Sequence, residues 1–184
     1  MYSEKVNAAD INGASLIANT GMDEKIQING SYNVECVGED GEIKWTDTIK
    51  NLVVTVGKND LLDKYFAGSA YTAAWYMGLV DGASTPTYAA SDTLASHAGW
   101  TESTAYSGSN RITVAWNAAS SGSKSSTATS FSINATATIA GALLTVTQVR
   151  ATTTGVLYSA GNFSGGSRSV VSGDTLLVTY TASV

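Results

Sequence analysis

The sequence is poor in the residues that cross-link small folds. It contains one cysteine, Cys36, one histidine, His97, and one proline, Pro86. A lone cysteine excludes an intrachain disulfide, and no set of Cys and His residues is present from which a zinc site can be built. We therefore expect a fold without cofactors or metals that rests on packing and hydrogen bonds.

Positive charge is also scarce. Ten Lys and Arg residues stand against fifteen Asp and Glu residues, which gives a formal net charge of -5. A nucleic-acid binder needs clustered Lys and Arg to displace the counterions of phosphates, and the basic residues here are scattered. We therefore expect no nucleic acid as a partner.

Long apolar runs are missing too. No stretch approaches the roughly 20 apolar residues of a membrane helix, and residues 1–22 lack the cationic start and apolar run of a signal peptide. We therefore expect no membrane partner, and a protein that is made in a cytoplasm and stays soluble.

Residues for catalysis are few. Any Ser-His-Asp or Cys-His site must be built around His97, but Ser96–Trp100 shows no strand-to-helix turn that would present a nucleophile. A packing histidine beside Trp100 is the favoured interpretation, and Cys36 is read as a small buried hydrophobic residue. We expect no enzymatic activity.

The acidic residues leave two weaker alternatives open. The cluster Glu39, Asp40 and Glu42 suits a calcium ion or, as favoured here, a solvated hairpin tip, because the EF-hand spacing is absent. A glycosidase needs two facing carboxylates, and four residues are candidates by composition alone. These are Asp81, Asp92, Glu102 and Asp174.

The four tryptophans also allow two interpretations. They can line a sugar-binding groove, although aromatic residues within apolar strands are more often core residues. We expect the latter for Trp75 and Trp116, leaving Trp45 and Trp100 without a firm assignment.

Residues 1–22 form a predicted N-terminal arm. They are mostly small and polar, and Ile11, Leu16 and Ile17 are their few apolar anchors. Such a segment cannot build its own core, so it orders only against a neighbouring chain. The three anchors are therefore the candidate contacts with a neighbouring chain.

Residues 23–184 read as a single β-rich domain. Apolar residues alternate from Ile26 through Cys36, and Glu39–Gly41 supplies a hairpin turn. Later alternating stretches are predicted strands: 112–116, 129–134, 138–147 and 176–181. The Gly- and Ser-rich stretches 120–126 and 161–166 are predicted loops. Because the helical crossovers of a parallel sheet are missing, the pattern predicts an all-β antiparallel sandwich.

The middle of the chain combines the predicted helix with buried strands. The run Leu52–Val56 predicts a strand that Gly57 ends, and a helix is expected from Asp60 to Phe66, closed by Gly68. Its apolar side, which should pack on the sandwich edge, comprises Leu61, Leu62, Tyr65 and Phe66. Residues 73–80 predict another buried strand, and 91–97 a short helical turn.

Three segments resemble structural proteins of tailed bacteriophages: 51–76 (NLVVTVGKNDLLDKYFAGSAYTAAWY), 96–102 (SHAGWTE) and 172–181 (SGDTLLVTYT). They are spread over most of the chain from about residue 30 onward. The resemblance implies a head decoration, or cement, protein with a jelly-roll-like sandwich on the capsid exterior. Its partners would be the major capsid protein and further copies of itself, as a trimer in preference to a dimer.

Other functions remain alternatives. A tail or head-fibre component belongs to the same structural class, although no repeated short β-motif is present. A carbohydrate-binding module or depolymerase fragment that uses the tryptophans is a candidate of a different class. A hydrolase is the weakest because the acid and base residues are few.

Overall fold

The computed structural model describes residues 27–66 and 74–184. The predicted arm, with Ile11, Leu16 and Ile17, lies outside the described residues, and so does Gly68. Within them, no helix is long and apolar enough to cross a membrane.

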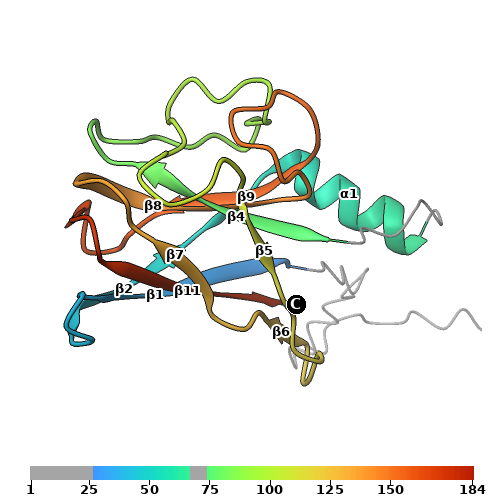
Figure 1. Ribbon diagram of the computed structural model, residues 1–184. Helices are drawn as coiled ribbons and strands as arrows, with labels where there is room; N and C mark the ends of the chain where they lie inside the picture. Colours follow the sequence, from blue (N-terminus) through green and yellow to red (C-terminus); the bar gives the residue numbers. More distant parts are fainter. Residues whose placement is uncertain (1–26, 67–73) are drawn as a thin grey trace, which may run out of the picture.

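Two antiparallel sheets face each other (Figure 1). The first runs in the order β2-β1-β11-β6, with β7 also pairing β11, and contains β1 (Asn29–Val37), β2 (Ile43–Lys50), β6 (Ser123–Ser125), β7 (Thr129–Ser132) and β11 (Thr175–Ser183). The second runs β3-β9-β8-β4-β5, with β10 also pairing β8, and contains β3 (Leu52–Val53), β4 (Trp75–Asp81), β5 (Ile112–Val114), β8 (Ala137–Thr145), β9 (Leu157–Asn162) and β10 (Arg168–Val170). The predicted all-β antiparallel sandwich with one short helix is confirmed.

The hairpin of β1 and β2 follows from local sequence. Tyr32, Val34 and Cys36 alternate along β1 and are buried, while the residues between them face outward. Gly41 closes the turn with a φ of 82°, a conformation that favours glycine. The predicted hairpin and the predicted burial of Cys36 are both confirmed.

The second sheet is buried on both faces. Its inner face packs against the first sheet in the main core, which includes Met77, Leu79 and Leu144. Its outer face carries a second cluster in which Val80 and Leu143 pack with Leu94 and Trp100. Residues 82–111, the connection from β4 to β5, supply Leu94 and Trp100 and so cover this sheet (Figure 1).

The helix begins earlier than predicted. Helix α1 spans Thr55–Phe66, so the strand expected over Leu52–Val56 ends at Val53 and Gly57 lies inside the helix. A Cβ atom at Gly57 would lie 2.5 Å from the backbone oxygen of Tyr158 in β9. Gly57 is therefore where the first turn of α1 approaches the backbone of the second sheet, rather than the end of a strand.

The predicted apolar side of the helix is mostly uncovered, which corrects the expectation that it packs on the sandwich. Leu61 contacts the main core, but Leu62, Tyr65 and Phe66 are 42 %, 80 % and 67 % exposed. The reason is the position of α1, which contacts β9 through its first turns and extends past the strand ends (Figure 1).

Further corrections concern segments rich in small residues. Residues 91–97 form hydrogen-bonded turns and no helix, with the amide of Asp92 donating to the carbonyl of Ala89. The predicted loop 120–126 contains strand β6, and the predicted loop 161–166 contains the end of β9. Strand β10 was not predicted.

Candidate functional site

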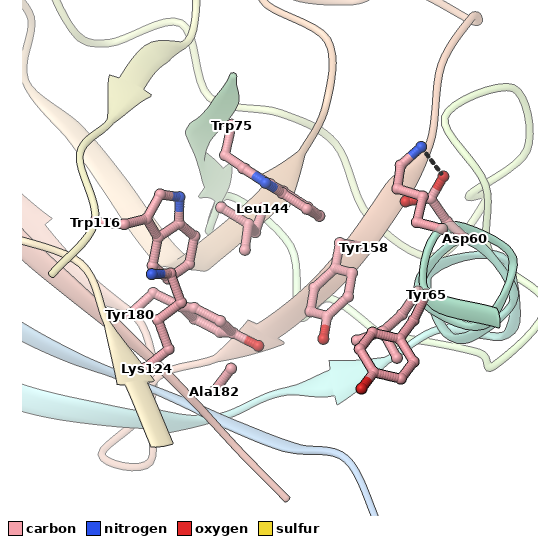
Figure 2. Close-up of a pocket in the computed structure, with 11 residues that line it drawn as sticks. Asp60, Tyr65, Trp75, Trp116, Lys124, Leu144, Tyr158, Tyr180 and Ala182 are labelled. Atoms are coloured by element: carbon pink, nitrogen blue, oxygen red, sulfur yellow. Dashed lines mark ion pairs between the residues drawn. The ribbon is translucent and has the colours of Figure 1, made fainter. Parts of the chain in front are cut away.

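A hollow of about 490 Å³ opens where α1 meets one end of the sandwich (Figure 2). Its most prominent side chains are aromatic: Trp75 from β4, Trp116 just after β5, Tyr158 from β9, Tyr180 from β11 and Tyr65 from α1. We call this hollow the aromatic groove. It is assembled from both sheets and the helix, and thus from distant parts of the sequence.

Four of these rings form a closed cycle of edge-to-face contacts. Trp75 lies 6.4 Å from Trp116 and 5.2 Å from Tyr158 between ring centroids. Tyr180 completes the cycle at 6.1 Å from Trp116 and 6.4 Å from Tyr158. All four contacts are nearly perpendicular, the arrangement that aromatic quadrupoles favour, so the rings hold one another in place. The groove is therefore preformed.

The floor and walls differ in exposure. Tyr158 and Tyr180 are buried at the floor, whereas Trp75 and Trp116 are half-buried on the walls. Burial raises the pKa of the Tyr158 and Tyr180 hydroxyls, so both remain neutral at physiological pH. Because the sheets fix these side chains, a ligand meets an uncharged and rigid apolar surface.

The charged groups at the rim already have partners. Lys64 and Asp60 form an ion pair of 3.1 Å along α1, which Figure 2 shows as a dashed line. The ammonium group of Lys124 donates to the backbone oxygen of Asn117 at 2.7 Å and lies 6.0 Å from the ring of Trp116. The groove is thus apolar inside, with cations at its edge.

An exposed apolar side of α1 adjoins the groove. It consists of Leu62, Tyr65 and Phe66, and the rings of Tyr65 and Phe66 contact each other at 4.9 Å. Tyr65 belongs to both features. Scattered apolar residues are normal on a protein surface, but a contiguous apolar area beside a groove is typical of an interaction site.

The histidine lies elsewhere and packs as predicted. Its ring stacks on Trp100 at 4.0 Å, and Nδ1 lies 3.0 Å from the Trp100 carbonyl oxygen. A second hollow there includes Glu102 and Arg111, but both carboxylate oxygens of Glu102 accept hydrogen bonds of 2.9 Å from the Arg111 guanidinium.

The other candidate carboxylates each serve a structural contact. Asp81 accepts a hydrogen bond from the amide of Ala83, and Asp92 accepts one from the indole of Trp100. Asp174 accepts from the Lys44 ammonium group at 2.8 Å. Burial alone would raise the pKa of Asp174, but the bonds from Lys44 and the Val171 amide lower it below its ordinary value.

The acidic hairpin tip is exposed, as predicted. Glu39, Asp40 and Glu42 lie at the surface, where Asp40 accepts a hydrogen bond from the amide of Glu42. Among the described residues, no three acidic, His or Cys side chains are placed to hold a metal ion.

From the sequence, Trp75 and Trp116 were assigned to the core and not to a groove. Trp75 and Trp116 do pack against the main core, yet both also line the groove. Tyr65, Tyr158 and Tyr180 were not predicted as site residues. The structure says nothing of Ile11, Leu16 and Ile17, so their role as contacts remains a prediction.

Comparisons with known proteins give no relative: no family model matches the chain, and no curated protein matches it. The fold and the site therefore define the class by themselves. It is a β-sandwich with a rigid, apolar, aromatic groove at one end.

Proposed function

We propose that this protein is a non-catalytic structural component of a tailed-bacteriophage particle that decorates the capsid by binding between capsomers. Two things support the proposal. The sequence resembles such proteins in three segments, and the sandwich presents its apolar groove next to an exposed apolar helix side.

The groove is the observation that carries this proposal. Aromatic side chains contribute much of the binding energy at protein interfaces, because they bury a large area with few rotatable bonds. The cycle around Trp75, Trp116, Tyr158 and Tyr180 is ordered before any partner binds, which reduces the entropic cost of association. A cement protein needs such a surface and no reactive group.

The proposal includes the partners. One is the major capsid protein, and another is the protein itself, with trimers at threefold lattice positions favoured over dimers at twofold positions. The predicted arm, through Ile11, Leu16 and Ile17, would secure the assembly. The protein would then lie on the capsid exterior after synthesis in the host cytoplasm.

Mass spectrometry of virions purified with and without tails tests the location. The protein should remain at full stoichiometry in tail-free heads. Its loss together with the tails would contradict decoration and favour the tail component instead.

Variants test whether the groove end carries the binding. Tyr65→Ala combined with Phe66→Ala should weaken binding to decoration-free capsids at least tenfold, because two exposed aromatic anchors are removed from the surface through which copies associate on the capsid. The control is Ile43→Ala, which truncates an apolar side chain that is 58 % exposed in β2, at the end of the first sheet opposite to Asn29 and Ala182. Equal affinity of both variants would contradict the assignment of this surface.

Carbohydrate binding is the second candidate function, and the partly exposed Trp75 and Trp116 are the observation that favours it. It ranks lower because sugar hydroxyls need polar partners, and Asp60 and Lys64 at the rim are already paired with each other. Quenching of the tryptophan fluorescence by host-surface glycans would raise this function above the first.

We further propose that no metal contributes to stability. Five of the carboxylates named above, those of Asp40, Asp81, Asp92, Glu102 and Asp174, already accept hydrogen bonds from protein donors. Chelation with EDTA should leave the thermal midpoint unchanged, whereas a fall of many degrees would restore the calcium interpretation of Glu39, Asp40 and Glu42.

A further inference from the structure

The lining of the aromatic groove indicates what kind of group it can bind. Its walls and floor are aromatic and uncharged, so water forms few hydrogen bonds there. An aliphatic side chain, by contrast, is stabilised there because its apolar surface leaves water. A volume of about 490 Å³ accommodates a few such side chains of an extended segment.

The path of the chain brings one such segment to the rim. Asn29, the first residue of β1, pairs with Ser183 of β11, and the adjacent Ala182 lines the groove. At the next position, a Cβ atom on Gly30 would collide with the hydroxyl of Tyr180 on the groove floor. The described part of the chain therefore begins beside the groove, and residues 1–26 precede it in the sequence.

The composition of residues 1–26 fits the groove. Ile11, Leu16 and Ile17 are aliphatic. The sequence around them shows no strand pattern, so these residues cannot form a core of their own. The segment contains four acidic residues and two basic ones, which complements the Lys124 cation at the rim. These are Glu4, Asp10, Asp23 and Glu24 against Lys5 and Lys25.

We infer that the aromatic groove binds Leu16 and Ile17 of a second copy of this chain, so that the copies exchange N-terminal segments. This inference deepens the self-association contained in the proposed function. From Ile17 to Ile28 the chain can extend about 36 Å at roughly 3.3 Å per residue, which is enough to reach a neighbour's groove.

The exposed side of α1 favours a second copy over the chain's own segment. A segment that returns to its own groove fills the groove but leaves Leu62 and Phe66 in water. A second copy that docks on this face covers these residues as well. Its N-terminal segment then starts beside the first copy's groove, and symmetry repeats the exchange.

Disulfide trapping between two variants that each gain one cysteine tests the exchange in purified protein. One variant carries Leu16→Cys and the other Tyr65→Cys, at the exposed edge of the groove. Mixed and oxidised, they should give a covalent heterodimer, because a disulfide forms only where the two Cα atoms come within about 7 Å. The native Cys36 is buried and does not compete.

Controls distinguish the possible occupants. Leu16→Cys mixed with Ile43→Cys, at the exposed opposite end of the first sheet, should give at least tenfold less heterodimer. Equal yields at both positions would overturn the inference. A chain with both Leu16→Cys and Tyr65→Cys that forms only an intrachain disulfide would also overturn it, because the groove would then hold its own segment.

Sedimentation equilibrium provides a second readout. Leu16→Ser combined with Ile17→Ser should raise the dissociation constant of the oligomer at least tenfold, and Ala14→Ser combined with Ala18→Ser should leave it unchanged. A parent protein that stays monomeric at all concentrations would contradict the inference. Since no capsid is present, these results are independent of the mass spectrometry that tests the location on the virion.

Discussion

The connection 82–111 and the aromatic groove differ in a way that reverses the usual expectation for loops. The connection has no helix or named strand, yet its polar side chains have partners in the fold. Glu102 pairs with Arg111 within the connection, and the hydroxyl of Tyr88 donates to Asn162 of β9. The groove is built largely from a helix and strands, yet its side chains leave space for a ligand. Loops often carry function. Here the polar groups of the connection form hydrogen bonds within the fold, and the surface that is open to a ligand lies on the helix and the strands.

Two tryptophans illustrate the difference. Trp100 in the connection is buried, and its indole nitrogen donates to Asp92 at 3.0 Å. Trp116 at the groove is half-buried, and its indole nitrogen has no hydrogen-bond partner among the described residues. A buried donor without a partner costs stability, so the groove end is less optimised for stability than the loop.

The largest expected effect is the loss of the loop's ion pair. Arg111→Ala should lower the free energy of unfolding by about 3–5 kcal/mol, because it leaves the Glu102 carboxylate without a cation and removes the donor to the carbonyls of Thr147 and Val149. Lys64→Ala, which breaks the ion pair at the groove rim, should cost less than about 0.5 kcal/mol. Urea denaturation measures both. Similar losses would remove the contrast between the regions.

Two adjacent leucines in α1 locate the boundary of the stable core. Leu61→Ala should cost about 2 kcal/mol because Leu61 packs against the main core. Leu62→Ala should cost less than about 1 kcal/mol because that side chain is 42 % exposed. Thermal or urea unfolding of the two variants checks the difference, and a larger loss for Leu62 would mean that α1 buries its other side.

Removing each indole N–H gives a smaller effect. Trp100→Phe should cost about 1–2 kcal/mol, since Asp92 then loses a buried donor. Trp116→Phe should stay within about 0.5 kcal/mol of the parent, because its indole N–H makes no hydrogen bond to a described residue. Equal losses in urea denaturation would show that ring volume, and not hydrogen bonding, separates the two sites.

Acid gives the smallest and most local effect. Burial would raise the pKa of Asp47, but Arg168 and two amides lower it overall, and Lys44 does the same for Asp174. A lowered pKa stabilises the fold above the ordinary value of about 3.9, and this contribution disappears as the pH falls through the folded pKa. Below about pH 4, the protection factors against hydrogen exchange should therefore fall at the amides of Gly165 and Val171, which donate to these carboxylates.

The groove provides the comparison for the acid experiment. Burial raises the pKa of Tyr158 and Tyr180, so acid leaves both neutral. Amides in the β9 and β11 segments beside them should keep their protection at the same pH. A loss of protection in β9 and β11 as well would mean that acid unfolds the whole sandwich cooperatively. Asp174→Asn should reduce the pH dependence at Val171.

Local patterns predicted much of the fold. The hairpin needed only alternation along β1 and a turn with Gly41, and the long strands β8 and β11 were found in the same way. Gly57 misled the prediction because its role depends on the backbone of Tyr158, a hundred residues away, and not on its neighbours in sequence. Strand β9 was missed because Gly161 must be small where it approaches Ile49 and Asn51, a requirement that no local pattern shows.

The groove was beyond prediction for the same reason. Trp75, Trp116, Tyr158 and Tyr180 lie on separate elements with no shared spacing, and the pairing of strands alone brings them together. The only available signal was apolar aromatic residues near strand ends, which describes core residues equally well. Among the candidates named from sequence, the two tryptophans were assigned to the core, and the structure gives them the groove as a second role.

The pairing of β1 with β11 has a consequence for how the chain folds. Their register joins Asn29 to Ser183 and Val37 to Thr175, and β11 also pairs with β6 and β7. The first sheet therefore cannot close until residues 175–183 have left the ribosome, and until then the β1–β2 hairpin has an open edge. Such long-range pairing makes folding slow, because a large loop must close before its contacts form. A nascent chain stalled before Thr175 should have the hairpin but neither the closed sheet nor the groove.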